Sequence, residues 1–172
     1  IPRGQLIAMI HAQIAVLEGL AKCGQQSIQY IKPHGALYND MMKDTVIFET
    51  VVFALHTYYQ QYPLTVQALA DNSKQQNIAA QYNIDLIYEA FADRAYDDNG
   101  YLVSRTLPKA VLNEEEALAQ VELLLSDGCV LSQSGQRLQV LADTVCVHSD
   151  TPDALILCKK IHALVAKHKR GS

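Results

Sequence analysis

The feature that most constrains the fold is the alternation of short apolar segments with longer helical patterns along the 172 residues. The short runs are rich in β-branched and aromatic residues, which favour strands, whereas apolar residues spaced three and four apart indicate helices. Strands that alternate with helices are usually joined by crossovers and form a mostly parallel sheet. The sequence therefore predicts an α/β fold. Because no repeat or linker-like stretch interrupts it, we expect a single domain over residues 1–172.

The predicted elements follow one another with short loops between them. Strands are expected at 28–31, 64–69, 84–91 and 144–148. Helical regions are expected at 4–22, 36–60, 72–82 and 114–126, with Asp44 or Thr45 capping part of the second and Asn113 capping the fourth. Residues 93–108 are expected to be a loop with a turn at 97–100, and a polar stretch without an assigned element follows the fourth helix. Asp150-Thr151-Pro152 is expected to open the final helix.

Composition excludes several classes of function. A formal net charge of −4 gives no electrostatic reason to expect a nucleic-acid partner, and the basic residues near 160 and 167–170 read as a solvated end of the final helix. No signal peptide is recognisable, and no apolar run reaches the roughly 20 residues of a membrane span, so a cytoplasmic protein is expected. The cysteines form no CxxC pair, which predicts reduced, mostly buried thiols: Cys23, Cys129, Cys146 and Cys158.

Titratable residues gather where three of the predicted strands end. In parallel α/β folds the carboxyl ends of the strands share one edge of the sheet, and sites collect there. Three strand ends that carry such groups are a stronger indication than any one of them. The residues concerned are Lys32 and His34 after the first strand, Glu89, Asp93 and Arg94 at the third, and His148 and Asp150 at the last.

Each of these residues also has a purely structural interpretation, and the residues alone leave both open. Lys32 fits an ordinary exposed lysine, and His34 fits a loop histidine that hydrogen-bonds only to backbone. Asp93 and Arg94 fit an ion pair that pins the loop, and Asp150 fits a helix cap. Glu89 is harder to explain in this way, because a carboxylate in an apolar strand needs a partner.

Several familiar catalytic patterns are missing from the sequence. There is no GxxxxGK[ST] phosphate loop, no GxGxxG, no GxSxG elbow and no HExxH spacing among the histidines. The chain is therefore not expected to bind ATP through a common phosphate-binding loop.

Three segments resemble signatures of one bacterial family. Tyr30–Asn39 resembles the YVKPHGALYN signature of the LamB/YcsF family, whose members form the A component of 5-oxoprolinase. Glu89–Tyr96, continued by Gly100, Leu102, Val103 and Arg105, resembles the EvFADRaY…G.LV.R segment of that family. Val145–Pro152 resembles its CVHGDTP segment. The three segments occur in the family's order and span nearly the whole chain.

The resemblance implies a fold, a reaction and partners. The fold would be a distorted β/α barrel similar to polysaccharide deacetylases. The reaction would be the ATP-dependent hydrolysis of 5-oxoproline to glutamate, in which the B and C partner subunits activate the lactam with ATP and the A component completes ring opening. Carried onto matching positions, the catalytic residues would be Lys32, His34, Glu89, Asp93 and His148. The substrate-binding residues would be Arg94, Arg105 and Asp150.

The chain departs from the family pattern in length and at two loop positions. Family members begin with segments that resemble NCDLGE, ACGFHAGD and GAHPGYPD, which do not occur here. The chain is therefore expected to be the later two-thirds of a longer domain, with an incomplete barrel. Lys109 stands where the family has glycine in its PGA stretch, and Ser149 replaces the glycine of CVHGDTP. Both changes affect backbone freedom without touching a charged residue.

Two other functions remain open at this point. The deacetylase-like fold suggests a metal-dependent hydrolase of a carbohydrate or another amide, which would bind a divalent metal. A non-catalytic assembly partner would instead bind the other subunits without turnover. An apolar surface left exposed by missing segments would also favour self-association, so a homo-oligomer is a further expectation.

Overall fold

The computed structural model describes residues 1–149 and 153–171, and the side chains of residues 169–171 are outside that description. The chain forms two compact units. The first comprises Ile1–Gln67 and Asn72–Ile87, and the second comprises Ala68–Asp71 and Tyr88–Ser172. The single-domain boundary stays a prediction, because compact substructures of this kind also occur within one domain.

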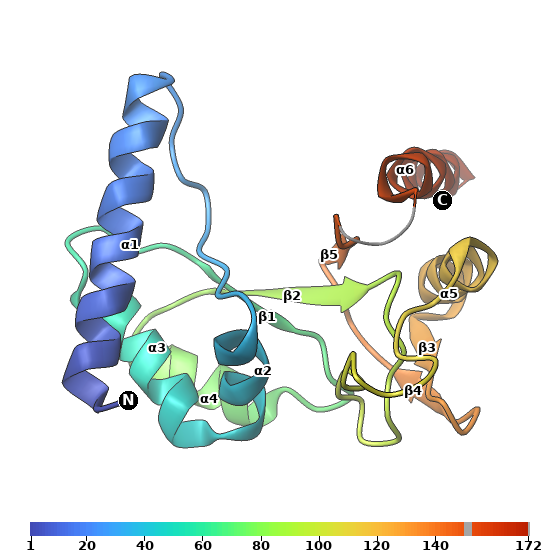
Figure 1. Cartoon of the computed structure of the whole chain (residues 1–172), viewed down its shortest axis with the longest axis horizontal. Helices are drawn as coiled ribbons and strands as arrows, with labels where there is room; N and C mark the ends of the chain where they lie inside the picture. The colour runs from blue at the N-terminus through green and yellow to red at the C-terminus, as the bar shows by residue number, and fades with distance from the viewer. Residues whose placement is uncertain (150–152, 172) are drawn as a thin grey trace. The chain divides into compact units, whose positions relative to one another are not determined.

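The first unit contains mainly helices (Figure 1). Its elements are α1 (Arg3–Cys23), α2 (Ala36–Lys43), α3 (Thr45–Thr57), strand β1 (Leu64–Gln67) and α4 (Ser73–Gln81). The predicted helical region 36–60 is divided at Asp44, whose extended backbone ends α2. The Asp44 carboxylate accepts the N–H groups of Val46 and Ile47, and this confirms Asp44 as the cap of α3.

The predicted strand 28–31 is wrong in its extent. Only Ile31 forms a bridge, which is parallel to Leu64. Its N–H donates to Pro63 O at 2.9 Å, and Thr65 N donates to Ile31 O at 2.8 Å. Tyr30 beside it is 52% exposed. A β-forming composition predicts a strand only where a neighbouring strand provides a continuous ladder, and here the ladder is one residue long.

A buried carboxylate ties α1 to the segment after α3. Glu18 of α1 accepts hydrogen bonds from the phenols of Tyr58 and Tyr59, each at 2.7 Å, and from that of Tyr62. The Tyr62 hydrogen bond lowers the pKa of Glu18 below its ordinary value of 4.5, against the opposing effect of burial. Burial, followed by the bond to Glu18, raises the pKa of Tyr58 to about 12. One ionised carboxylate with phenolic donors thus fixes α1 in place.

We expect this cluster to make the stability of the first unit depend on acid. The lowered folded-state pKa of Glu18 means that its stabilisation is present above pH 4.5, and is lost as the pH falls through the folded-state value. Glu18→Gln should lower the melting temperature at pH 7 and flatten its decline in acid. Thermal unfolding from pH 3 to pH 7 measures this, with the exposed Glu122→Gln as the control. An unchanged pH profile in Glu18→Gln would contradict the assignment.

Helix α1 also departs from the expectation that nothing has the properties of a membrane span. By length and composition alone it could cross a membrane, although buried core helices and N-terminal signal sequences pass the same test. The expectation was based on uninterrupted apolar runs, whereas the apolar residues of α1 are interspersed with Gly and Gln. In this structure His11 Nε2 lies 2.7 Å from Ala54 O of α3, and Ile10 and Ile14 are buried. These contacts hold one face of α1 against the unit.

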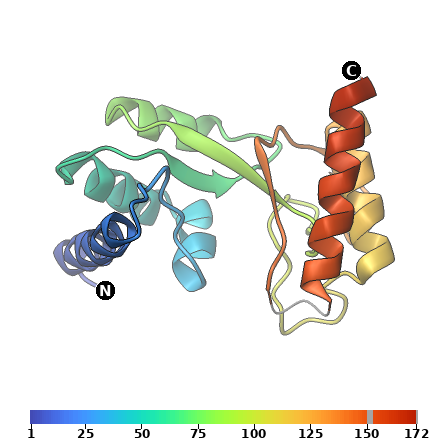
Figure 2. The same ribbon diagram turned by 90° about the horizontal axis from the view of Figure 1, so that it is seen from above.

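The second unit contains the end of the sheet and two long helices. Strand β2 (Leu86–Phe91), of which the first two residues belong to the first unit, pairs in parallel with β5 (Thr144–Cys146), and the strand order is β1-β2-β5. This confirms the predicted α/β class with a parallel sheet, while the barrel stays a prediction. Helices α5 (Glu114–Asp127) and α6 (Ala154–Gly171) lie side by side in Figures 1 and 2. Their shared core contains Ala117, Val121, Leu157 and Ile161.

The stretch after α5 holds a hairpin that the sequence analysis did not assign. Strands β3 (Cys129–Leu131) and β4 (Arg137–Gln139) pair antiparallel, and Gly135 in the turn has φ 87°.

The Asn113 capping box at the start of α5 confirms the predicted cap. Asp150-Thr151-Pro152, the predicted opening of α6, lie outside the described residues.

All four cysteines are free, as expected, but only Cys129 is buried. Cys23 and Cys158 are exposed, and Cys146 is half-buried. The expectation of mostly buried thiols is therefore wrong. Cys23 lies at the end of α1 and Cys158 on an outer face of α6, where no other described element covers them.

Candidate functional site

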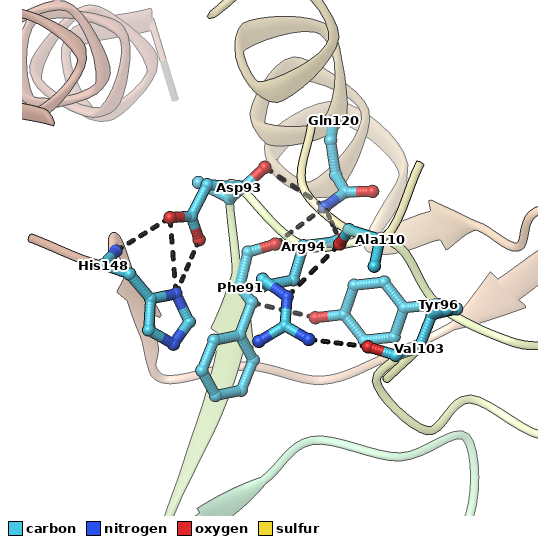
Figure 3. A network of polar contacts seen from close by, with 9 residues as sticks. Phe91, Asp93, Arg94, Tyr96, Val103, Ala110, Gln120 and His148 are labelled. Carbon is cyan, nitrogen blue, oxygen red and sulfur yellow. Dashed lines mark hydrogen bonds and ion pairs between the residues drawn. The ribbon is translucent and has the colours of Figure 1, made fainter. Parts of the chain in front are cut away.

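The best-defined polar site in the second unit lies where β2 and β5 end. Asp93 follows β2 by two residues, His148 follows β5 by two residues, and the two strands are adjacent and parallel. The Asp93 carboxylate accepts the backbone N–H of His148 at 2.8 Å. Its two oxygens also lie 3.0 and 3.3 Å from His148 Nδ1 (Figure 3). The expectation that neighbouring strand ends bring titratable residues together is confirmed for this pair.

The surroundings of the pair fix both the ring and its tautomer. Asp93 has no exposed side-chain surface, whereas the His148 side chain is 26% exposed. The His148 ring stacks on Phe91, with centroids 5.5 Å apart and an interplanar angle of 16°. When Asp93 is ionised, its carboxylate only accepts hydrogen bonds, and Nδ1 of His148 then carries the proton. The lone pair of a neutral His148 is therefore on Nε2, which makes the ring suitable as a general base.

A glutamine on α5 holds the backbone around Asp93. Gln120 Nε2 lies 2.7 Å from Phe91 O, 3.3 Å from Ala92 O and 3.0 Å from Arg94 O. Figure 3 shows this side chain reaching the loop from the helix above it. Sequence reasoning missed Gln120. The available signal was a polar residue on the apolar face of α5, between the buried Ala117 and Val121.

Tyr96 supports the end of β2 from within the loop. Its hydroxyl accepts the N–H of Phe91 at 2.8 Å, and its side chain has no exposed surface. Burial raises the pKa of Tyr96, so the phenol stays neutral and retains its own proton. A neutral hydroxyl at this place satisfies a buried backbone donor next to the His148–Asp93 pair.

Arg94 is clamped to the loop that follows it. The residue is 6% exposed, and its guanidinium donates to Ala110 O at 3.2 Å from Nε and to Val103 O at 2.6 Å. These contacts give Arg94 a positioning role in the 95–112 loop. Its predicted contact with a substrate stays a prediction.

The other predicted site residues of the second unit have different surroundings. Glu89 is buried on β2, opposite Thr144 of β5. Arg105 is exposed in the loop, and Asp150 lies outside the described residues. These positions do not test a functional role for Glu89, Arg105 or Asp150, so the roles of these three residues stay predictions.

Lys32 and His34 belong to the first unit. Lys32 is half-buried, with its Nζ 5.6 Å from the centre of the Tyr38 ring, and His34 is exposed before Gly35, the residue preceding α2. Both line a groove of about 950 Å³ together with Ile14 of α1. Gly35 has φ 64°, a left-handed conformation that explains a glycine directly after His34.

The described residues include no cluster of metal-ligating side chains. Within 1–149 and 153–171, no group of three or more His, Cys, Asp or Glu side chains is arranged to hold a metal ion. His148 and Asp93 satisfy each other, and two ligands are fewer than metal sites in proteins use.

The chain matches the LamB/YcsF family over residues 1–171. A protein of Vibrio campbellii, named as the A component of 5-oxoprolinase, is 44% identical over 158 residues, which are 91% of this chain and 62% of that protein. One of the same name from Pseudomonas fluorescens is 39% identical over 154 residues, covering 89% of this chain and 62% of that protein.

A solved structure has the same fold. The lactam utilization protein from Thermus thermophilus superposes with a TM-score of 0.83 and 25% sequence identity. The match covers 97% of this chain and 66% of that structure. The chain thus spans about three-fifths of the length of the curated relatives and two-thirds of the solved one. With motifs, relatives and fold in agreement, the chain belongs to the LamB/YcsF family.

Proposed function

We propose that this chain supplies the acid/base pair of a lactam hydrolase that opens 5-oxoproline to glutamate. The observation that carries the proposal is the buried Asp93 carboxylate fixed to Nδ1 of a partly exposed His148. The names of the curated relatives, which are 5-oxoprolinase components, support the choice of substrate. The name lactam utilization protein of the solved relative supports the bond type.

In the proposed reaction His148 activates water. Nε2 takes a proton from a water molecule as its oxygen attacks the lactam carbonyl carbon, and Asp93 stabilises the imidazolium that forms. The resulting oxyanion is tetrahedral, and its collapse breaks the carbon–nitrogen bond of the ring. The imidazolium returns its proton to the leaving nitrogen. One water is consumed, and the products are the free amine and carboxylate of glutamate.

An amide resists this attack, which gives ATP its proposed place. An amide carbonyl is a poor electrophile, and phosphorylation of its oxygen by ATP would convert it into a better one. The same attack of water and cleavage of the carbon–nitrogen bond would then leave an acyl phosphate, which a second water hydrolyses to glutamate and inorganic phosphate. The chain has no GxxxxGK[ST] loop, so we assign ATP activation to B and C partner subunits. The word subunit in the relatives' names supports an assembly of more than one component.

The other two functions make different demands. A metal-dependent deacetylase-like hydrolase needs at least three ligands, and the described residues offer no such group. A non-catalytic partner has no use for a partly exposed histidine that is oriented by a buried carboxylate. The His148–Asp93 geometry therefore favours the hydrolase component.

Reconstitution of the full-length protein with its B and C partners tests the proposal. Glutamate should form from 5-oxoproline only when ATP and all three components are present, and removal of any one should abolish it. Lys32→Ala and His34→Ala, the two variants that the motif resemblance singles out, are expected to lose most of this activity. The proposal would be overturned if glutamate formed without ATP, or if no glutamate formed with all three components folded and ATP present.

A further inference from the structure

The second unit contains a pocket that includes neither Asp93 nor His148. It has a volume of about 520 Å³, within the range of sites for small molecules. Its walls are mainly apolar, formed by Ala95, Leu112, Ala119, Leu123 and Leu131. The polar side chains that line it are Lys109, Glu116, Gln120, Ser132 and Gln133. Such a pocket suits a ligand with an apolar body and a single polar end.

Lys109 at this pocket adopts a backbone conformation that lysine rarely takes. Its φ is 58°, in the left-handed region that glycine adopts without strain. Gln133 Nε2 donates to Pro108 O and Lys109 O, each at 3.4 Å, and so holds the turn from the hairpin side. Because glycine adopts this conformation without strain, Lys109→Gly removes the ammonium group without straining the turn.

Charges of both signs line the pocket, on Lys109 and Glu116. Among the described residues, no carboxylate lies within ion-pair distance of the Lys109 ammonium group. Glu116 also lines the pocket, but its carboxylate accepts the backbone N–H of Asn113 at 2.9 Å in the capping box. It would repel a second carboxylate on a ligand, so the pocket favours monocarboxylates.

We infer that this pocket binds a small apolar monocarboxylic acid, with its carboxylate at Lys109 and its body against Ala119, Leu123 and Leu131. The inference does not depend on the proposed hydrolase function, because it concerns binding to another part of the second unit. Gln120 links the two places: it lines the pocket and also donates to the carbonyls on both sides of Asp93. A bound acid thus contacts a residue that positions the His148–Asp93 pair.

The test measures binding of 3-phenylpropionate and of its neutral amide, 3-phenylpropionamide, by ligand-observed NMR titration. The acid should bind about fivefold more tightly than the amide, as one partly exposed ion pair provides. Lys109→Gly should remove this difference and leave the affinity for the amide unchanged. Lys109→Arg should keep the preference, and Lys159→Ala on α6 serves as the matched control.

Folding of the key variants can be checked separately. Lys109→Gly relieves the strained backbone, so its melting temperature should not fall. Ala119→Phe fills the pocket and should abolish binding of both compounds. Equal affinity for acid and amide in the unaltered chain would overturn the inference. The inference would also be overturned if the acid did not bind, or if the Lys109→Gly variant still bound the acid more tightly than the amide.

Discussion

His148→Ala is expected to lower kcat for glutamate formation by about 10³-fold in the reconstituted complex, because it removes the proposed general base. Asp93→Asn should cause a loss of similar size. The amide that this substitution introduces can donate a hydrogen bond to Nδ1 of His148. The imidazole then carries its own proton on Nε2, so Nε2 has no lone pair with which to act as a base. The contacts that lead to this expectation are the 3.0 Å approach of Asp93 to Nδ1 and the 2.8 Å bond to the His148 backbone.

Two readouts separate a chemical role for His148 from a structural one. In the variants the KM for 5-oxoproline should change much less than kcat, because the pair acts on water and the leaving nitrogen. Any ATP hydrolysis by the proposed partner subunits should persist while glutamate formation stops. His162→Ala, an exposed histidine on α6, is the matched control and should keep full activity. Full turnover in folded His148→Ala would refute the assignment of the base.

Much of the fold could be predicted from residue patterns because most elements are specified locally. Asp44 and Asn113 have side chains that cap the helices following them, and both caps are observed. The apolar run of β2 also suffices to predict a buried strand. The segment 28–31 was overpredicted, since its ladder depends on a neighbour and not on its own composition. The β3–β4 hairpin was missed because three-residue strands have too few positions for an alternating pattern.

The site could be predicted in part for a similar reason. Titratable residues after β2 and β5 indicate a shared edge, and the parallel pairing brings Asp93 to His148. The support around them depends on tertiary contacts that no local pattern contains. Gln120 is 26 to 29 residues from the carbonyls that it binds. The guanidinium of Arg94 bonds to carbonyls 9 and 16 residues away, which no local pattern indicates, and its contact with a substrate stays a prediction.

Arg94→Met is expected to destabilise the second unit by about 3 kcal/mol, which is large for one substitution. Methionine keeps an apolar stem but removes the charged donors to Val103 O and Ala110 O. The loop between them is otherwise closed by backbone bonds from Ala95 N to Ala110 O and from Val103 N to Ala95 O. Urea unfolding measures the loss, and hydrogen exchange should show it first in the 95–112 loop.

The control for Arg94→Met is Arg137→Met, which removes an exposed ion pair with Asp127 and should leave stability nearly unchanged. The two results together distinguish burial from charge, since both variants lose one guanidinium. Because Leu112 N donates to Asp93 O at 3.0 Å, the end of this loop is attached to the residue that orients His148. Arg94→Met should therefore also lower kcat, even under conditions in which the variant is folded. Stability equal to that of Arg137→Met would show that the loop does not need its guanidinium clamp.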